Sequence, residues 1–443
     1  MLIETLRARI ETLDSEIQAQ RELLTRLERE KSCVQYQLNM VRDPISRLPI
    51  EISSQIFIHS LDGFGKPGFG HIPALFLSVC NSWSSIALGT PELWSAIHIT
   101  FPCAKGFPEI CLDRAQKRPL SIILDGVFEP DVVDTIWNRA QQLEYLEIRL
   151  PEQPDGGPVR LALWRGASPP GPFLSLKTFK LSDRHLPEDL DAWHVSLAHV
   201  VQLLRLAPNL NECVFDVQYT HYHGVLKDGE KILLPNVRRL DFGNNMIPRC
   251  DDEIIQHLSL PKLEFLSIPL QEVDAHTILS FLTTQSPPLK ELILGNGGTS
   301  QSADILLECL RAAPELELFD AWMTPTTATS LFIALSKHSS LLCRLATLVI
   351  HCPPAHVVDL YQPLWNATLD VTTARHEQLK VFHIDLSRGG PPHENLPDAN
   401  TIAALRILAD AGMRDTHYWR SRRRSLRIRT LSFLATLMHH IVL

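Results

Sequence analysis

The chain has 443 residues, which predicts two or more domains or a repeat array, because a single core stops growing before this length. Its net charge of −8 disfavours a general nucleic-acid binder, since phosphate contacts need clustered Lys and Arg. Nine cysteines without a C-x-x-C pair favour a reducing compartment.

The first ten residues, MLIETLRARI, carry charges throughout and therefore do not resemble a signal peptide. No apolar run approaches the ~20 residues that a membrane-spanning helix needs. We therefore expect an intracellular protein, cytoplasmic or nuclear, with no membrane and no nucleic acid among its partners.

Residues 2–42 carry apolar side chains at the 3.5-residue spacing of a coiled coil. With Ile3 as heptad position a, the a and d positions are Ile3, Leu6, Ile10, Leu13, Ile17, Gln20, Leu24, Leu27, Lys31, Val34, Leu38 and Val41. Pro44 ends the predicted helix. One interpretation is a homodimer through residues 3–41, and the other is one long helix folded back on its own protein.

Residues 44–97 predict two short amphipathic helices. The first carries Leu48, Ile52, Ile56 and Phe57 on one face, with Pro49 near its start. The second carries Leu75, Phe76, Val79, Cys80, Trp83, Ile86 and Ala87, and Gly89-Thr90-Pro91 ends it. So much apolar surface on a small module favours a partner protein.

Two motifs in this stretch resemble an F-box, in the form common in fungal F-box-like families. They are L-P-x-E-I-x-x-x-I-F from Leu48 to Phe57 and V-C-x-x-W-x-x-I-A-x-x-x-P-x-L-W from Val79 to Trp94. The resemblance implies docking on a Skp-type linker, the adaptor protein of a cullin–RING ubiquitin ligase. The residues implied to contact that linker are Pro44, Leu48, Pro49, Ile52, Ile56, Phe57, Val79 and Trp83. The loop from Phe64 to His71 is longer than the family pattern.

Residues 93–99 alternate as a strand does, and the chain then repeats the motif L-x-x-φ-x-φ, where φ is apolar. Copies begin at Leu143, Leu176, Leu210, Val237, Leu263, Leu289, Leu316, Leu345 and Leu379, and the middle copies are 26 or 27 residues apart. Helical segments are predicted at 189–206, 274–284, 302–312 and 326–337. One strand and one helix per repeat resemble degenerate leucine-rich repeats, which implies a solenoid with a parallel sheet inside and helices outside.

The expected fold class is an α/β (α+β) repeat in four parts. These are a coiled-coil helix at 1–43, an F-box domain at 44–100, a leucine-rich-repeat-like solenoid at 101–400, and a helix with a basic tail at 401–443. The tail holds six arginines between Arg420 and Arg429, which fit either a nuclear-import or anionic-surface patch or a solvated tail.

Within each repeat, the residues between the φ positions should face away from the core. This set is mildly acidic and predicts a face that binds a peptide or protein; the alternative is a solvated surface without a ligand. The candidate substrate-binding residues are Tyr145, Arg239, Asp241, Phe265, Glu291, Asp320 and His383.

The sequence contains no catalytic motif that fits its context, so we expect a non-enzyme without a metal or cofactor. Gly63 to Gly68 matches G-x-G-x-x-G, but Pro67 blocks the helix start that would hold a pyrophosphate. The groups His221/His223 and His351/Cys352/His356 lack the paired spacing of a zinc module. The leading interpretation is a substrate-recognition adaptor of an SCF-type ubiquitin ligase, and the alternative is an interaction scaffold that engages no ligase.

Overall fold

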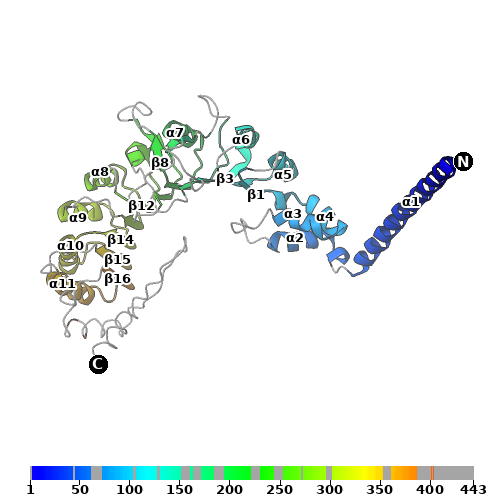
Figure 1. Ribbon diagram of the computed structural model, residues 1–443. Coiled ribbons are helices and arrows are strands. Elements are labelled where there is room, and N and C mark those ends of the chain that lie inside the picture. The colour runs from blue at the N-terminus through cyan, green and yellow to red at the C-terminus, as the bar shows by residue number, and fades with distance from the viewer. Residues whose placement is uncertain are drawn as a thin grey trace. The chain divides into compact units, whose positions relative to one another are not determined.

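A computed structural model describes the chain as two compact units, Met1–Leu124 and Asp125–Leu443 (Figure 1). The described residues are 2–42, 45–60, 72–102, 106–126, 130–150, 160–161, 163, 171–183, 194–220, 230–243, 253–270, 273–295, 302–352, 361–386, 401 and 403. Within them the chain is α/β, with a long first helix and a mainly parallel sheet accompanied by helices.

The first unit begins with one uninterrupted helix, α1 (Leu2–Arg42), as the sequence predicts. No Gly or Pro interrupts its 41 residues. Every side chain from Leu2 to Leu38 is exposed, so the apolar heptad positions lie uncovered on its surface.

A helical module follows α1. It consists of η1 (Ile45–Arg47), α2 (Ile50–Ser60), α3 (Ile72–Val79), α4 (Asn81–Leu88) and η2 (Pro91–Trp94). The second predicted helix is wrong in one respect: it is two helices, because Cys80 has extended backbone angles (φ −161°, ψ 168°). The predicted end at Gly89 is confirmed, and its N–H donates to the Ser85 carbonyl at 3.0 Å.

The first unit ends with β1 (Ala96–Thr100), α5 (Phe107–Ala115) and all but the last residue of β2 (Leu120–Asp125), and the two strands are neighbours in a sheet. The predicted strand at 93–99 begins later, because Leu93 and Trp94 belong to η2. The Trp94 indole N–H donates to the Ala87 carbonyl at 2.7 Å, which holds η2 against the end of α4.

The second unit is built on a parallel sheet whose strands follow one another in chain order. They are β3 (Leu143–Leu150), β5 (Thr178–Asp183), β7 (Glu212–Asp216), β10 (Arg239–Asp241), β12 (Phe265–Ile268), β13 (Glu291–Leu294), β14 (Leu318–Trp322), β15 (Thr347–Cys352) and β16 (Val381–Leu386). Each described pair of neighbours is parallel.

Helices connect these strands and lie on one side of the sheet, most clearly from α8 onward (Figure 1). They are α6 (Pro130–Trp137), α7 (Leu197–Leu206), α8 (Ala275–Gln285), α9 (Ala303–Arg311), α10 (Pro325–Lys337) and α11 (Tyr361–Ala374), with η3 (Ala140–Gln142) and η4 (Glu253–His257). Small sheets form from β4 (Arg160–Leu161), β6 (His194–Ser196) and β8 (Gln218–Thr220), and from β9 (Ile232–Leu233) and β11 (Leu258–Ser259).

Three of the four predicted helices match α8, α9 and α10 to within two residues. The helix predicted at 189–206 begins only at Leu197, because 194–196 form the strand β6. The preceding residues 184–193 lie outside the described part of the chain.

The φ positions of the repeated motif form the core beneath the helices. From Leu146 and Ile148 on β3 to Leu348 and Ile350 on β15, every such pair is buried. Phe382 and Ile384 on β16 are half-buried, at the end of the strand order. Because alternate residues of a strand point to opposite faces, the residues between the φ positions form the other face of the sheet.

Several sequence predictions concern residues outside the described part of the chain. These are Pro44, the loop from Phe64 to His71 with its glycines, His221, His223, His356 and the arginines from 420 to 429. Of the part predicted at 401–443 as a helix with a basic tail, only Thr401 and Ala403 are described, and both are helical.

Two candidate interaction surfaces

Three aromatic rings hold the helical module of the first unit together. Phe57 of α2 stacks on Phe76 of α3, with ring centroids 4.3 Å apart, and lies 5.0 Å from Trp83 of α4. Phe57 is only 2% exposed, and Trp83 is half-buried. The expectation that Phe57 shares the outward face of Ile52 and Ile56 is therefore wrong, because its ring faces the other helices.

Polar contacts fix the same inward face of α2. Ser53 is fully buried, one turn before Phe57, and its hydroxyl donates to the Ile45 carbonyl at 3.1 Å. The hydroxyl groups of Ser54 and Thr90 lie 2.9 Å apart and join α2 to the end of α4. The inward stripe of α2 is thus set by packing and hydrogen bonds.

Several aliphatic side chains of the module are exposed. Ile52 on α2 is 50% exposed and Val79 on α3 is 55% exposed. We name as the aliphatic surface the exposed side chains Leu48, Ile50, Ile52, Ile56, Leu75 and Val79, and Pro49 is exposed beside them. Single exposed apolar residues are ordinary, but six on three short segments are typical of a surface that a partner covers.

In the second unit, we name the sheet face opposite the core the inner face. The predicted candidates lie in two rows on it. The first row is Tyr145, Thr178, Glu212, Arg239, Phe265, Glu291, Leu318, Thr347 and Val381. The second is Glu147, Lys180, Val214, Asp241, Ser267, Ile293, Asp320, Val349 and His383. Each residue pairs in register with the next, so the alignment of repeats made from sequence is confirmed strand by strand.

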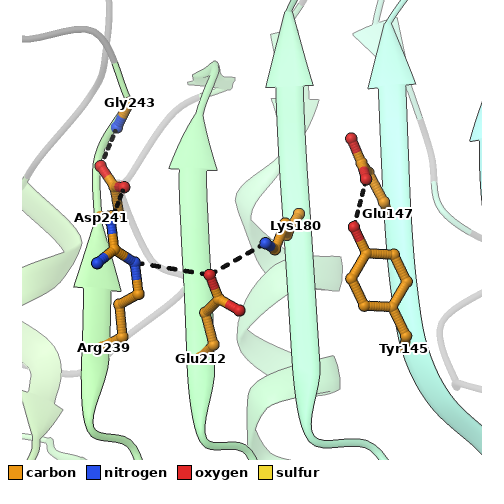
Figure 2. Close-up of polar contacts among 7 residues, drawn as sticks. All are labelled: Tyr145, Glu147, Lys180, Glu212, Arg239, Asp241 and Gly243. Carbon is orange, nitrogen blue, oxygen red and sulfur yellow. Dashed lines mark hydrogen bonds and ion pairs between the residues drawn. The ribbon is translucent and has the colours of Figure 1, made fainter. Parts of the chain in front are cut away.

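Alternating charges join neighbouring strands at the β3–β10 end of the inner face (Figure 2). Glu212 accepts from Lys180 at 3.0 Å and pairs with Arg239 at 3.6 Å. Arg239 also donates to Asp241 at 2.8 Å. These acids are thus paired with bases within the sheet.

A glycine terminates this charge network. Gly243 has φ +82°, and its N–H donates to the Asp241 carboxylate at 3.0 Å. A Cβ at this position would lie 2.3 Å from the Asp216 side chain. Only glycine combines this backbone conformation with the space available.

Tyr145 and Glu147 form a hydrogen-bonded pair on β3 (Figure 2). Burial would raise the pKa of Glu147, but hydrogen bonds from Arg149 and Tyr145 outweigh it and lower that pKa. Burial, followed by the bond to Glu147, raises the pKa of Tyr145. The pair therefore presents a neutral phenol and a carboxylate already bonded at neutral pH.

Phe265 was expected to be exposed, and this is wrong: it is 9% exposed. The Arg239 guanidinium lies 3.4 Å from the centroid of its ring. This cation–π contact across neighbouring strands covers the ring. Beyond it the middle of the inner face mixes aliphatic and polar side chains: Ile293, Leu318 and Val349 are half-buried, with Glu291 and Asp320 in the same two rows.

At the other end of the inner face, His351 lies between two carboxylates. Its Nε2 is 3.1 Å from Asp320 and its Nδ1 is 3.3 Å from Asp385. Burial alone would lower the pKa of His351, but the two hydrogen bonds raise it to about 9. Trp322 stacks on the imidazole at 4.8 Å, and His383 lies 6.4 Å away.

Sequence reasoning named Asp320 and His383 as candidates, considered His351 only as a metal ligand, and did not name Trp322 or Asp385. His351, Trp322 and Asp385 occupy a third row, two residues beyond the second, in which Trp322 pairs with His351 and His351 with Asp385. Extending the motif by two positions would have found them.

The described residues contain no group of three or more His, Cys, Asp or Glu side chains placed to hold a metal ion. Among the described helices, none is both long and apolar enough to cross a membrane. The sequence matches no protein-family model, and comparison with curated proteins gives no match.

Proposed function

We propose that this chain is a substrate-recognition adaptor of an SCF-type ubiquitin ligase. In this proposal the helical module is an F-box that docks on a Skp-type linker and through it on a cullin–RING ligase. The observation that carries the proposal is the aliphatic surface, which includes Leu48, Ile52, Ile56 and Val79 of the F-box-like motifs.

Side-chain burial divides the motif residues of the module into two groups. One group packs the helices together, and the other is exposed to a partner. Phe57 and Trp83 pack inside and hold the helices, whereas Leu48, Ile52 and Val79 remain available for a partner. Fully burying one such aliphatic side chain contributes about 1.5–3 kcal/mol, so a few of them supply a specific interface.

The second half of the proposal is that the strand–helix units form a leucine-rich-repeat-like solenoid whose inner face binds the protein substrate. The in-register rows offer charged groups along their length, with aliphatic side chains such as Ile293, Leu318 and Val349 among them. Aliphatic contact area together with charged groups is what a specific protein-binding surface needs.

Co-purification with a co-expressed Skp-type linker tests the first half. Wild type should retain the linker, and Leu48→Asp with Ile52→Asp should lose it while keeping the helical circular dichroism signal. Gln55→Asp is the matched control, because Gln55 is an exposed polar residue of the same helix. A wild type that fails to retain the linker contradicts the proposal.

The second candidate function is an interaction scaffold without a ligase, which the inner face would support equally. Asp241→Lys with Glu291→Lys should change the set of proteins bound by the full chain and leave linker retention intact. If these substitutions change the bound proteins but wild type binds no linker, the scaffold function is the better account.

A further inference from the structure

We propose that α1 pairs with α1 of a second copy as a parallel, in-register, two-stranded coiled coil. This pairing does not depend on the adaptor function. It has a defined orientation and register, and specific charged residues meet across it.

The apolar seam of α1 has no cover within the described part of the chain. Ile3, Leu6, Ile10, Leu13 and Ile17 are between 42% and 66% exposed. The same spacing continues through Leu24, Leu27, Val34 and Leu38, all exposed. A seam spanning more than five heptads costs free energy in water unless another helix covers it.

The residue types along the seam favour two parallel strands. The a positions begin with Ile3, Ile10 and Ile17, and the d positions with Leu6 and Leu13. β-Branched residues at a with leucine at d favour a parallel dimer over higher oligomers.

The charges beside the seam select the parallel register. In a parallel pair, position g of one helix meets position e of the next heptad on the other. Arg9 then meets Asp14 of the second copy, and Glu16 meets Arg21 of the second copy. Two-fold symmetry repeats each attractive pair.

The aligned antiparallel arrangement brings like charges together. There e positions meet e positions and g positions meet g positions, so Asp14 would face Glu28 and Glu16 would face Glu30. Arg21 would face itself in the second copy. Such repulsion is unfavourable. Of these two arrangements, the parallel dimer both buries the apolar seam and pairs opposite charges beside it.

Polar residues inside the seam fit the same register. Gln20 at d meets its own counterpart, so the two amides can bond to each other, and any shift of register would bury them against leucine or isoleucine. Lys31 at a also meets its counterpart, with Glu28 and Glu30 nearby on the same helix. Gln20 and Lys31 lower the stability of the coiled coil but favour its in-register alignment.

Light scattering on the full chain tests the dimer. The chain mass is 50.0 kDa, and wild type should give twice this value. Leu13→Asp with Ile17→Asp should give the monomer mass, whereas Ala8→Asp with Ser15→Asp, at the outer f positions, should leave the dimer intact. A monomeric wild type, or a trimer or tetramer, overturns the proposal.

Cysteine cross-linking tests orientation and register. The background replaces Cys33 and Cys343, the exposed cysteines among the described residues, by serine, together with Cys103 and Cys250. Leu13→Cys at d should form a disulfide-linked dimer on oxidation, and Ser15→Cys at f should not. In the aligned antiparallel dimer, residue 13 lies opposite Lys31, roughly 27 Å along the helix from its counterpart, so no cross-link would form. Failure of Leu13→Cys to cross-link in a dimeric sample overturns the parallel register.

Reversing the charge at Asp14 should change the affinity of the dimer in opposite directions for the parallel and the antiparallel orientation. Asp14→Arg should weaken the parallel dimer about tenfold, and Arg9→Glu in the same chain should restore it. In the antiparallel dimer Asp14→Arg would strengthen association, which would overturn the proposal. Retention of the Skp-type linker by the monomeric variant should be unchanged. Failure of the dimer proposal can therefore be distinguished from failure of the proposed adaptor function.

Discussion

His351 is held between Asp320 and Asp385 on the inner face, and the pH dependence of stability reports this contact. Its pKa in the folded chain is about 9, above the ordinary value of 6.5. A raised folded-state pKa contributes stability that is fully present below pH 6.5 and is lost as pH rises through about 9. We predict that the urea midpoint of the second unit falls across this window.

The His351→Gln variant is the control for that pH dependence, because glutamine keeps polar atoms but does not titrate. Its urea midpoint should be lower than that of wild type at pH 6.5, and the difference should shrink towards pH 9. An unchanged difference across this window would show that His351 is not charged in the folded state.

The contacts of Arg375 predict a large loss of stability when this residue is replaced. It is 6% exposed and donates to the carbonyl oxygens of Leu335 at 3.0 Å, His338 at 2.6 Å and Leu341 at 2.9 Å. Arg375→Met would leave three carbonyls near the end of α10 without this donor, which should cost about 2–4 kcal/mol of unfolding free energy. Arg344→Met, at an exposed site, should change stability by less than about 0.5 kcal/mol, and equal effects would contradict the account.

At the scale of elements, α2 separates a packing face from an exposed face. Phe57→Ala should destabilise the helical module by about 3–5 kcal/mol, because the ring loses its contacts with Phe76 and Trp83. Ile52→Ala, on the exposed face, should cost less than about 1 kcal/mol. Urea unfolding followed by tryptophan fluorescence measures both, and a larger effect at Ile52 would contradict the assignment of faces.

Long elements and strand positions could be predicted from the sequence because their periodicity is local. The heptads predict α1, and the repeated motif predicts the strands and the register that joins Arg239 to Glu212 and Phe265. From β3 to β15 each repeat supplies the same two buried φ positions, so one correct copy aligns the next.

Details that depend on distant partners could not be predicted in this way. The break at Cys80 lies within a continuous apolar pattern, and only the packed structure shows its extended backbone. Phe57 and Ile56 are adjacent and both fit an apolar face; the rings of Phe76 and Trp83 decide which one turns inward. Phe265 is covered by an arginine from the preceding repeat.

At the scale of the whole molecule, the two proposed binding functions lie in different units. The first unit carries the proposed linker-binding surface and the helix proposed to pair with a second copy, and the second carries the inner face. Substitutions in one unit should therefore leave the binding reactions of the other intact.

Calorimetric titration of the purified full chain with a purified Skp-type linker tests the central claim most directly. The account predicts one linker bound per chain, at least about 100-fold weaker binding for Leu48→Asp with Ile52→Asp, and unchanged binding for Gln55→Asp and for Asp241→Lys with Glu291→Lys. Absence of binding by the folded wild-type chain, or unchanged binding by the aliphatic-surface variant, would contradict it.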